Sequence, residues 1–373
     1  MPARTVNREH ARARKGRGAG INPEGRFEGF AREAFDDGWA QAPAVQEARG
    51  EPAGAPALET HVTIERAKSI ISRNDSPDIP FSRSINPYRG CEHGCIYCYA
   101  RPSHAYLNLS PGVDFETRLF AKANAAELLR AELSRPGYEC DMIALGANTD
   151  PYQPIERKYR ITRGILEVLA ECKHPVAIVT KNALIERDTD ILSEMARKNL
   201  ARVFISLCNL DPDLARRLEP RCSAPARRLE AIRRLSARGI PVGVIVAPVI
   251  PFLTDDQVES VLEAAFKAGA READYTLLRL PYEVKDLFRD WLETHYPLKA
   301  RHVMSRVNAM RGGRDNDAQF GSRMCGSGEF AALLRMRFEI ACERLGFNAR
   351  GDRRALDTTR FRPPHRDGQL ELF

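Results

Sequence analysis

Between about residues 60 and 290, short apolar runs rich in β-branched residues alternate with stretches of helical period. Five of the apolar runs predict buried strands, at 140–147, 175–181, 201–208, 241–250 and 273–280. Four intervening stretches carry apolar residues three and four positions apart and predict helices, at 162–173, 188–200, 225–239 and 254–269. Asp188 and Thr254 are expected to cap the second and fourth of these helices.

Repeated strand–helix units of this size indicate parallel strands joined by right-handed crossovers. A further strand over 82–88 brings the number of units to six. No GxGxxG sequence opens the first unit, which disfavours a dinucleotide-binding sheet. We therefore expect an α/β fold, an incomplete (β/α)6 TIM-like barrel, with its chemistry where the strands end.

The segments on either side of this core differ from it in composition. Residues 1–57 are basic and rich in Ala, Pro, Gly and Glu, so we expect a disordered or loosely docked N-terminal arm. The core barrel is expected over 58–298. A small appendage over 299–368 combines a Gly-rich loop, an amphipathic helix and a polar spacer, and residues 369–373 read "QLELF".

The overall composition is that of an ordinary globular protein, with 43% hydrophobic and 29% charged residues. No apolar run reaches the ~18 residues of a membrane span, and the basic N-terminus lacks the apolar part of a secretory signal, so we expect a cytoplasmic protein. The net charge of +7 favours a polyanionic partner such as nucleic acid, although a solvated basic surface is an equally good explanation. Eight arginines between positions 216 and 238 are a candidate phosphate-binding patch.

Nine cysteines in a chain without an export signal point to metal binding, catalysis or burial rather than to disulfides. Three of them, Cys91, Cys95 and Cys98, lie within eight residues of one another. Four thiolates would suit a structural zinc or a closed cluster, whereas three thiolates on a four-iron cube leave one iron open to an outside ligand. A zinc site would need a fourth ligand, and His93 and His104 are both awkwardly spaced for that purpose.

The loop reads "CEHGCIYC", and this resembles the CxxxCxΦC signature of the radical S-adenosylmethionine (SAM) superfamily, with Tyr97 as the aromatic residue Φ. The resemblance implies a [4Fe–4S] cluster held by Cys91, Cys95 and Cys98, with SAM on the open iron. It also implies reductive cleavage of SAM to a 5′-deoxyadenosyl radical that abstracts hydrogen from a substrate. The electron would come from a donor such as flavodoxin or ferredoxin.

The sequences around the loop resemble one branch of the superfamily, which is related to spore photoproduct lyase and whose members are often called DNA repair photolyases. This resemblance covers about residues 60–290 and includes "GANTDPYQPIE" and "VTKNALIERD". It implies that Gly146, Asn148 and Asp150 lie at the SAM amino group. By the same resemblance Lys181 pairs with the SAM carboxylate and Ser206 lies near its ribose.

Hydrogen transfer is the point on which the chain departs from spore photoproduct lyase. The resemblance places Tyr97 and Tyr99 near the adenine and the path of the radical, as cofactor-binding and catalytic candidates. Ala147, however, stands where spore photoproduct lyase has a hydrogen-donating cysteine, so we do not expect that activity. Cys208 is an alternative donor because it is two residues from Ser206 and would share its face of a strand. Cys325, in the Gly-rich loop, is a second alternative.

The C-terminal "QLELF" resembles the peptide by which bacterial proteins bind the sliding clamp. An extended peptide of this kind docks in a groove, with Gln369 at the rim and Leu370, Leu372 and Phe373 in apolar pockets. A hydrophobic end folded back onto its own domain is the alternative.

Together these features favour a radical SAM enzyme that acts on DNA, in lesion repair or base modification. A radical SAM enzyme acting on RNA, a peptide or a small molecule is the first alternative. A non-catalytic, clamp-associated iron–sulfur module that binds DNA is the second.

Overall fold

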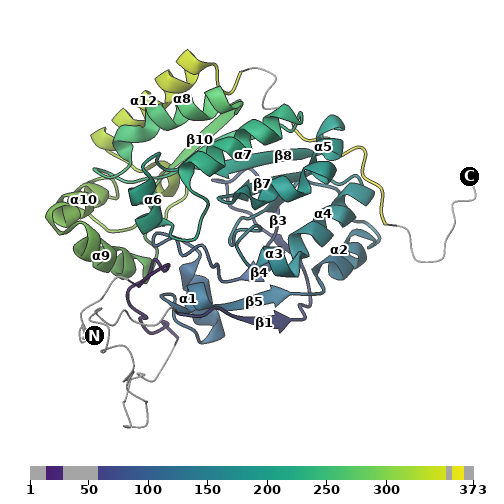
Figure 1. Ribbon diagram of the computed structural model, residues 1–373, viewed down its shortest axis with the longest axis horizontal. Helices are drawn as coiled ribbons and strands as arrows, with labels where there is room; N and C mark the ends of the chain where they lie inside the picture. The colour runs from purple at the N-terminus through teal and green to yellow at the C-terminus, as the bar shows by residue number, and fades with distance from the viewer. Residues whose placement is uncertain (1–13, 28–57, 350–354, 365–373) are drawn as a thin grey trace, which may run out of the picture.

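The computed structural model describes residues 14–27, 58–349 and 355–364 (Figure 1). Its centre is a seven-stranded sheet in the order β10-β9-β8-β7-β6-β3-β2. Six of these strands are parallel, and β2 pairs antiparallel with β3 at one edge. The strands are β2 (Ile71–Arg73), β3 (Arg83–Ile85), β6 (Ile143–Leu145), β7 (Val176–Thr180), β8 (Ala201–Ser206), β9 (Val242–Val249) and β10 (Glu272–Leu277).

The six parallel strands are the five that the apolar runs predict and the further strand predicted over 82–88. Within the described residues, β10 and β2 lie at opposite ends of the sheet and do not pair, so the barrel is incomplete as expected. The strands are apolar on both faces, and Ile178, Val203 and Val244 are fully buried. Burial on both faces is the usual state of a parallel sheet covered by helices.

The crossover helices also match the predicted segments. They are α4 (Ile161–Glu171), α5 (Thr189–Arg197), α7 (Pro225–Ala237) and α8 (Val258–Ala268). The last helix starts later than predicted, because a 3-10 turn, η4 (Asp255–Gln257), precedes it. Thr254 does not cap this helix: its hydroxyl donates to the carbonyl of Pro248 and accepts from the amide of Ile250. Asp188 is at the N-cap position of α5, but its carboxylate accepts from arginines instead of from the helix amides.

The connection between β3 and β6 is long and contains the cysteine loop. Its elements are β4 (Tyr88–Arg89), η2 (Arg101–Leu107), α1 (Asp114–Thr117), β5 (Arg118–Lys122) and α2 (Ala125–Leu133). β5 pairs in parallel with β1 (His61–Glu65) and antiparallel with β4, which gives a second, three-stranded sheet. Shorter elements after β6, β7 and β8 are α3 (Glu156–Tyr159), η3 (Ala183–Asp188) and α6 (Pro212–Leu218).

Residues 14–27, which belong to the predicted arm, lie against this connection. Arg17 donates to the carbonyl oxygens of Glu116 and Leu58, at 2.9 and 2.6 Å. The amides of Gly18 and Ala19 donate to the Glu116 carboxylate. Composition gives little sign of this segment because many of its contacts are polar, from backbone amides, Arg17 and Asn22, although Ala19 and Ile21 also pack in the core. We call residues 14–27 the strap; residues 1–13 and 28–57 lie outside the described part of the chain.

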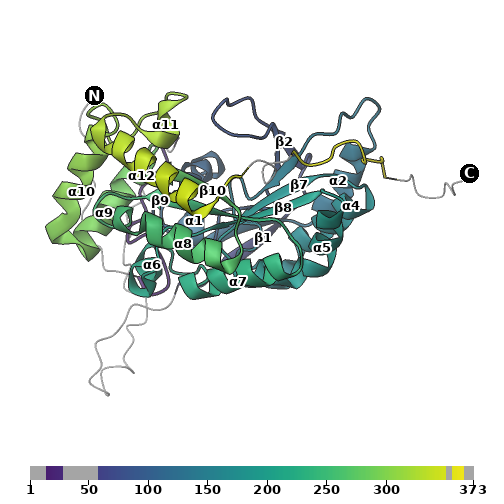
Figure 2. The ribbon, with the colours of Figure 1, turned by 90° about the horizontal axis from the view of Figure 1, so that it is seen from above.

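The chain after β10 is helical; its helices begin within the predicted barrel range 58–298 and continue into the appendage predicted over 299–368. Its helices are α9 (Val284–His295), α10 (Pro297–Ala309), α11 (Ser322–Cys325) and α12 (Glu329–Leu345). α12 lies along α8 (Figure 2), and Arg337 forms an ion pair with Glu259 at 2.7 Å between them. Among the described helices, none is long and apolar enough to span a bilayer. The clamp-like residues Gln369, Leu370, Leu372 and Phe373 lie outside the described residues.

Candidate active site

A cavity of about 530 Å³ lies at the carboxyl ends of the parallel strands. The cysteine loop forms one part of its wall, with Cys91, Cys95 and Cys98 all lining it. Gly146 follows β6, Lys181 follows β7 and Ser206 ends β8, and all three line the same cavity. The expectation that chemistry sits where the strands end agrees with this placement.

A buried ion pair holds the backbone of the cysteine loop. Arg101 is fully buried, and its guanidinium donates to the carbonyls of Cys95 at 2.9 Å and of Gly94 at 3.2 Å. The same guanidinium is 2.5 Å from the carboxylate of Glu116, the residue that also receives the strap. At Gly94, where φ is +68°, a Cβ atom would lie 2.8 Å from this carboxylate. The loop is therefore fixed by backbone contacts, which leaves the three thiols free of hydrogen bonds to Arg101.

The donor set fits a cluster better than a single metal ion. Within the described residues, no group of three or more His, Cys, Asp or Glu side chains converges as ligands of one ion. The ring of His93 is already engaged, with Nδ1 3.3 Å from Asp150 and Nε2 3.2 Å from the Asn182 amide. His93 is therefore not a free fourth ligand for zinc, and three thiols on one wall suit a four-iron cube with an open iron.

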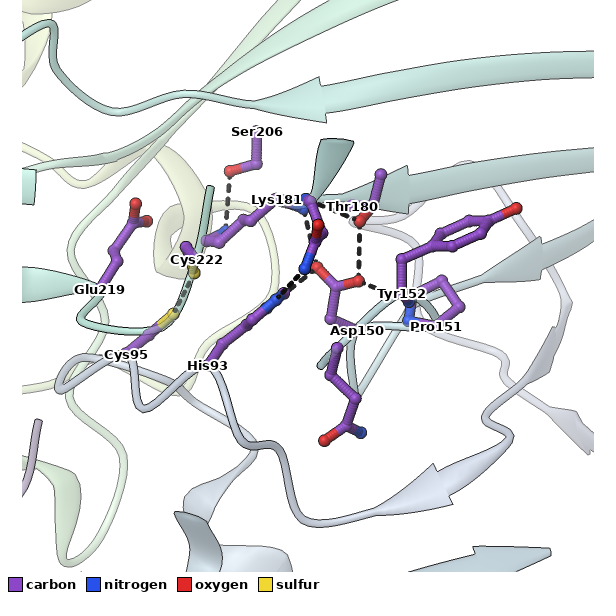
Figure 3. A network of polar contacts seen from close by, with 12 residues as sticks. His93, Cys95, Asp150, Pro151, Tyr152, Thr180, Lys181, Ser206, Glu219 and Cys222 are labelled. Carbon is purple, nitrogen blue, oxygen red and sulfur yellow. Dashed lines mark hydrogen bonds and ion pairs between the residues drawn. The ribbon is translucent and has the colours of Figure 1, made fainter. Parts of the chain in front are cut away.

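Asp150 is the centre of a polar network beneath the cavity (Figure 3). Its carboxylate accepts from the hydroxyl of Thr180 and from the amide of Lys181, each at 2.7 Å, and from the amide of Tyr152 at 2.8 Å. Burial favours a raised pKa for Asp150, but the charge of His93 and these hydrogen bonds lower it below its usual value. Asp150 thus joins the ends of β6 and β7 to the cysteine loop. Both Asp150 oxygens already accept hydrogen bonds within this network. Asn148 is exposed and lines the cavity, so its side chain is more available to the SAM amino group.

Lys181 lies in the cavity wall with its ammonium group directed at Ser206 (Figure 3), and the Nζ–Oγ distance is 2.8 Å. Burial disfavours its charge, but the Glu219 carboxylate and the Cys95 and Cys222 thiols together outweigh burial, so the pKa of Lys181 is raised. The structure therefore brings Lys181 and Ser206 together, as two cavity groups that can donate to an anion and a hydroxyl.

The two tyrosines that flank Cys98 differ in exposure. Tyr97 is buried and donates its hydroxyl to Glu219, whereas Tyr99 is half exposed and donates to the backbone carbonyl of Ala147. Both rings line the cavity, and so does Ala147. The predicted gathering of these residues around one site is therefore observed.

Cys208 does not reach the cavity. β8 ends at Ser206, so the alternation of faces stops there, and Cys208 is buried beside Glu219 and Asn209. Cys325, in α11, donates to the carbonyl of Gly321 at 3.1 Å and does not line the cavity either. Within the described residues, the cavity wall thus contains no thiol other than those of the cysteine loop.

Three functional positions escape sequence reasoning. Glu219 offsets the charge of Lys181, pairs with buried Arg228 and accepts from Tyr97. Cys222 places its sulfur 3.7 Å from that of Cys95. Arg279, at the end of β10, faces into the cavity. No motif marks any of them, because each acts through a contact between distant segments.

The arginines between positions 216 and 238 are less available for phosphate than predicted. Arg228 is buried on Glu219, and Arg227 and Arg234 pair with Glu186. Arg234 and Arg233 also pair with Glu230. These ion pairs neutralise much of the proposed patch.

Comparison with known families identifies the core. Residues 85–265 match the family described as "Radical SAM superfamily". The chain carries a radical SAM domain. The family implies a [4Fe–4S] cluster and SAM as cofactors, so the predicted fold and cofactors are confirmed, while the roles of the individual site residues stay predictions.

The chain is also similar to curated proteins from a bacterium and an archaeon. Uncharacterized protein Rv2578c of Mycobacterium tuberculosis is 40% identical over 221 residues, which span 59% of this chain and 65% of the relative. Uncharacterized protein MJ0683 of Methanocaldococcus jannaschii is 27% identical over 246 residues, which span 66% of this chain and 87% of the relative. The match to the mycobacterial protein therefore leaves about a third of that protein uncovered.

Among solved structures, spore photoproduct lyase shares the fold. Its complex with dinucleoside spore photoproduct has a TM-score of 0.55 and 16% identity, covering 77% of this chain and 80% of the lyase. A variant of the lyase with bound AdoMet and the same dinucleoside has a TM-score of 0.54 and 15% identity over the same shares.

Proposed function

We propose that this chain is a radical SAM enzyme that acts on DNA, in lesion repair or base modification. The observation that carries the proposal is the cavity itself, in which three thiols, Lys181 and Ser206 face one space at the ends of the parallel strands. When bound, the cluster and SAM supply a carbon-centred radical that abstracts hydrogen from a substrate. In this proposal Cys91, Cys95 and Cys98 hold the cluster.

The remaining residues bind and orient SAM. The turn at Gly146 and Asn148 offers backbone carbonyls and a short amide to the SAM ammonium group. Lys181, kept charged by Glu219, pairs with the carboxylate, and Ser206 lies where it can bond a ribose hydroxyl. Tyr97 closes the cavity floor, and its buried ring excludes water from the reacting centre.

DNA is proposed as the substrate on two supports. Spore photoproduct lyase, whose fold this chain shares, is known in complex with a dinucleoside lesion. In addition, the rim of the cavity carries the half-exposed ring of Tyr99 beside the guanidinium of Arg279, a pairing of aromatic face and cation that suits bases and phosphates.

The reaction we propose differs from that of spore photoproduct lyase. Ala147 occupies the position of the hydrogen-donating cysteine, and no thiol outside the cysteine loop lines the described cavity. A product radical in this cavity would meet Tyr99, whose hydroxyl is bonded to the carbonyl of Ala147, rather than a cysteine.

Anaerobic reconstitution with iron, sulfide, SAM and a reductant tests the proposal. Formation of 5′-deoxyadenosine is measured without nucleic acid, with undamaged and ultraviolet-irradiated DNA, and with RNA of the same sequence. We expect DNA to stimulate product formation, and Cys98→Ala protein to form none. Equal rates in all arms would contradict DNA as the substrate.

We also propose that residues 369–373 bind a bacterial sliding clamp. The support is the sequence "QLELF", in which a glutamine precedes three apolar anchors. In a pull-down, the full chain should retain the clamp and a chain lacking residues 369–373 should not. Equal retention by both chains would overturn this part of the proposal.

A further inference from the structure

We propose that Arg279 and Arg323 form an anion subsite at the mouth of the cavity, which takes a phosphodiester of the DNA strand next to the reacting nucleotide. This inference rests on the proposed DNA substrate and deepens it. It is carried by one guanidinium whose buried Nε atom has no acceptor and which forms no ion pair among the described residues.

Arg279 lies at the end of β10 and lines the cavity. Its Nε atom is buried and has no hydrogen-bond partner. Within the described residues, its polar contact is a weak one of 3.4 Å from Nη1 to the sulfur of Met324, and it forms no ion pair. A buried donor without an acceptor is costly, so an arginine whose Nε atom is in this state is best explained by a ligand that supplies the missing acceptor.

Arg323 adds positive charge next to Arg279. It pairs with Asp78 and donates to the hydroxyl of Ser76, both in the loop between β2 and β3. Burial and the charge of Arg323 lower the pKa of Arg279, and Tyr99 and Asp78 offset this only in part. An anion bound here would relieve the repulsion between the two guanidinium groups.

A third arginine fixes this arrangement. Arg311 is buried and donates to the carbonyl of Leu278, next to Arg279, at 2.8 Å. It also donates to the carbonyls of Ser322 and Arg323, at 3.0 and 2.8 Å. α11 is thereby tied to the end of β10, so Arg323 is held beside Arg279 before any ligand arrives. The carboxylate of Asp317, which is near Arg311, is occupied by Ser322 and the amide of Gln319.

The neighbouring aromatic rings indicate a nucleotide rather than a free carboxylate. The guanidinium of Arg279 is 5.5 Å from the ring centroid of Tyr99, which is 48% exposed. The guanidinium of Arg323 is 4.6 Å from that of Phe320, which is 60% exposed. Two cations, each beside an exposed aromatic face, are typical of surfaces that follow a single strand by stacking its bases and pairing its phosphates.

Equilibrium binding of a short, fluorescein-labelled single-stranded DNA to the reconstituted holoenzyme with SAM tests the subsite. A second probe has the same sequence with uncharged methylphosphonate linkages. We expect Arg279→Gln to weaken binding of the phosphodiester probe by about 10- to 100-fold, the usual range for a charge-assisted hydrogen bond, and to leave binding of the methylphosphonate probe unchanged. The salt dependence of log Kd should fall by about one unit of slope.

Two further variants control for charge and folding. Arg301→Gln removes the same charge from an exposed position of α10 that has no ion pair among the described residues, and it should bind as wild type does. Arg279→Lys retains the charge and should recover part of the affinity. Iron content and circular dichroism show whether each variant is folded and loaded.

The outcomes separate this inference from the proposed function. Arg279→Gln protein that binds the phosphodiester probe as wild type does overturns the subsite, even if DNA stimulates 5′-deoxyadenosine formation. Weakened binding of SAM with unchanged binding of DNA also overturns it, because Arg279 would then serve the SAM carboxylate. A wild-type protein whose SAM cleavage ignores DNA instead overturns the proposed function.

Discussion

At the scale of single residues, Lys181 is the group whose surroundings most clearly prepare it for an anion. Its ammonium group donates to Ser206 Oγ at 2.8 Å, and Glu219 keeps it charged in a buried wall. Glu219 does not use up that charge, since its carboxylate is shared with Arg228 and Tyr97.

Lys181→Met should therefore weaken SAM binding by about 10- to 100-fold, because it removes a charge-assisted hydrogen bond to the carboxylate. Ser206→Ala removes only a neutral hydroxyl and should cost less, about tenfold at most. Calorimetric titration of the reconstituted protein with SAM measures both. Unchanged affinity in Lys181→Met protein would mean that another group binds the carboxylate.

His174 allows a test of stability against pH away from the cavity. It is fully buried, with Nε2 2.8 Å from the Tyr138 hydroxyl and Nδ1 3.0 Å from the Pro175 carbonyl. Burial lowers its pKa to about 4, whereas an unfolded histidine has a pKa of about 6.5. The unfolded chain thus binds more protons than the native chain between these values. The free energy of unfolding should fall as the pH drops from about 6.5 to about 4, by up to about 1.4 kcal/mol per pH unit.

His174→Gln keeps a hydrogen-bonding side chain but does not titrate. We expect it to be less stable than wild type near pH 7 because of altered packing, and the difference to shrink as the pH approaches about 5. Urea unfolding at the two pH values measures this. A difference that stays constant with pH would show that His174 does not titrate on unfolding. His104, whose pKa burial also lowers to about 4, leaves some acid dependence in both proteins.

The sequence predicts the site residues that lie within a short motif, and it does not predict those that act through contacts between distant segments. The three cysteines, Lys181 and Ser206 were all predicted for one site, because each lies in or directly after a motif at a strand end. Cys208 was expected to share the face of Ser206 by strand alternation, but β8 ends at Ser206 and Cys208 does not line the cavity, so its role as a hydrogen donor stays a prediction. Glu219 and Arg279 were not predicted, since their importance comes from contacts across the barrel.

At the scale of elements, the strap makes the cysteine loop depend on a segment far away in sequence. Gly18 and Ala19 donate their amides to Glu116, which in turn holds Arg101 under the loop. The apolar pattern predicts the six parallel strands and the crossover helices, because burial imposes the period of each. It does not predict the strap, because backbone amides leave no pattern in the side chains.

Deletion of residues 1–27 should weaken retention of the cluster. Two amide hydrogen bonds to a buried carboxylate are lost, each worth about 1.5–3 kcal/mol, and Glu116 is left partly unsatisfied. Deletion of residues 1–13 keeps the strap and is the matched control. Iron and acid-labile sulfide per chain, measured after anaerobic gel filtration, compare the two proteins. Equal cluster content would show that the strap does not support the loop.

At the scale of the whole molecule, the parallel sheet brings the cysteine loop, the β6 and β7 turns and the rim arginines to one cavity. The helical appendage forms part of the cavity opening, because Arg323 and Met324 of α11 line the cavity. The radical SAM domain accounts for the floor of this cavity. The rim, with Tyr99, Arg279 and Arg323, is where we propose that DNA is selected.

Transfer of deuterium from DNA to 5′-deoxyadenosine tests the central claim most directly. The reconstituted enzyme is incubated with SAM, a reductant and perdeuterated DNA, either undamaged or ultraviolet-irradiated, and the 5′-deoxyadenosine is analysed by mass spectrometry. We predict that 5′-deoxyadenosine gains the mass of one deuterium from at least one of the two DNA substrates. If 5′-deoxyadenosine forms but carries no deuterium from either substrate, hydrogen is not taken from DNA and the account is contradicted.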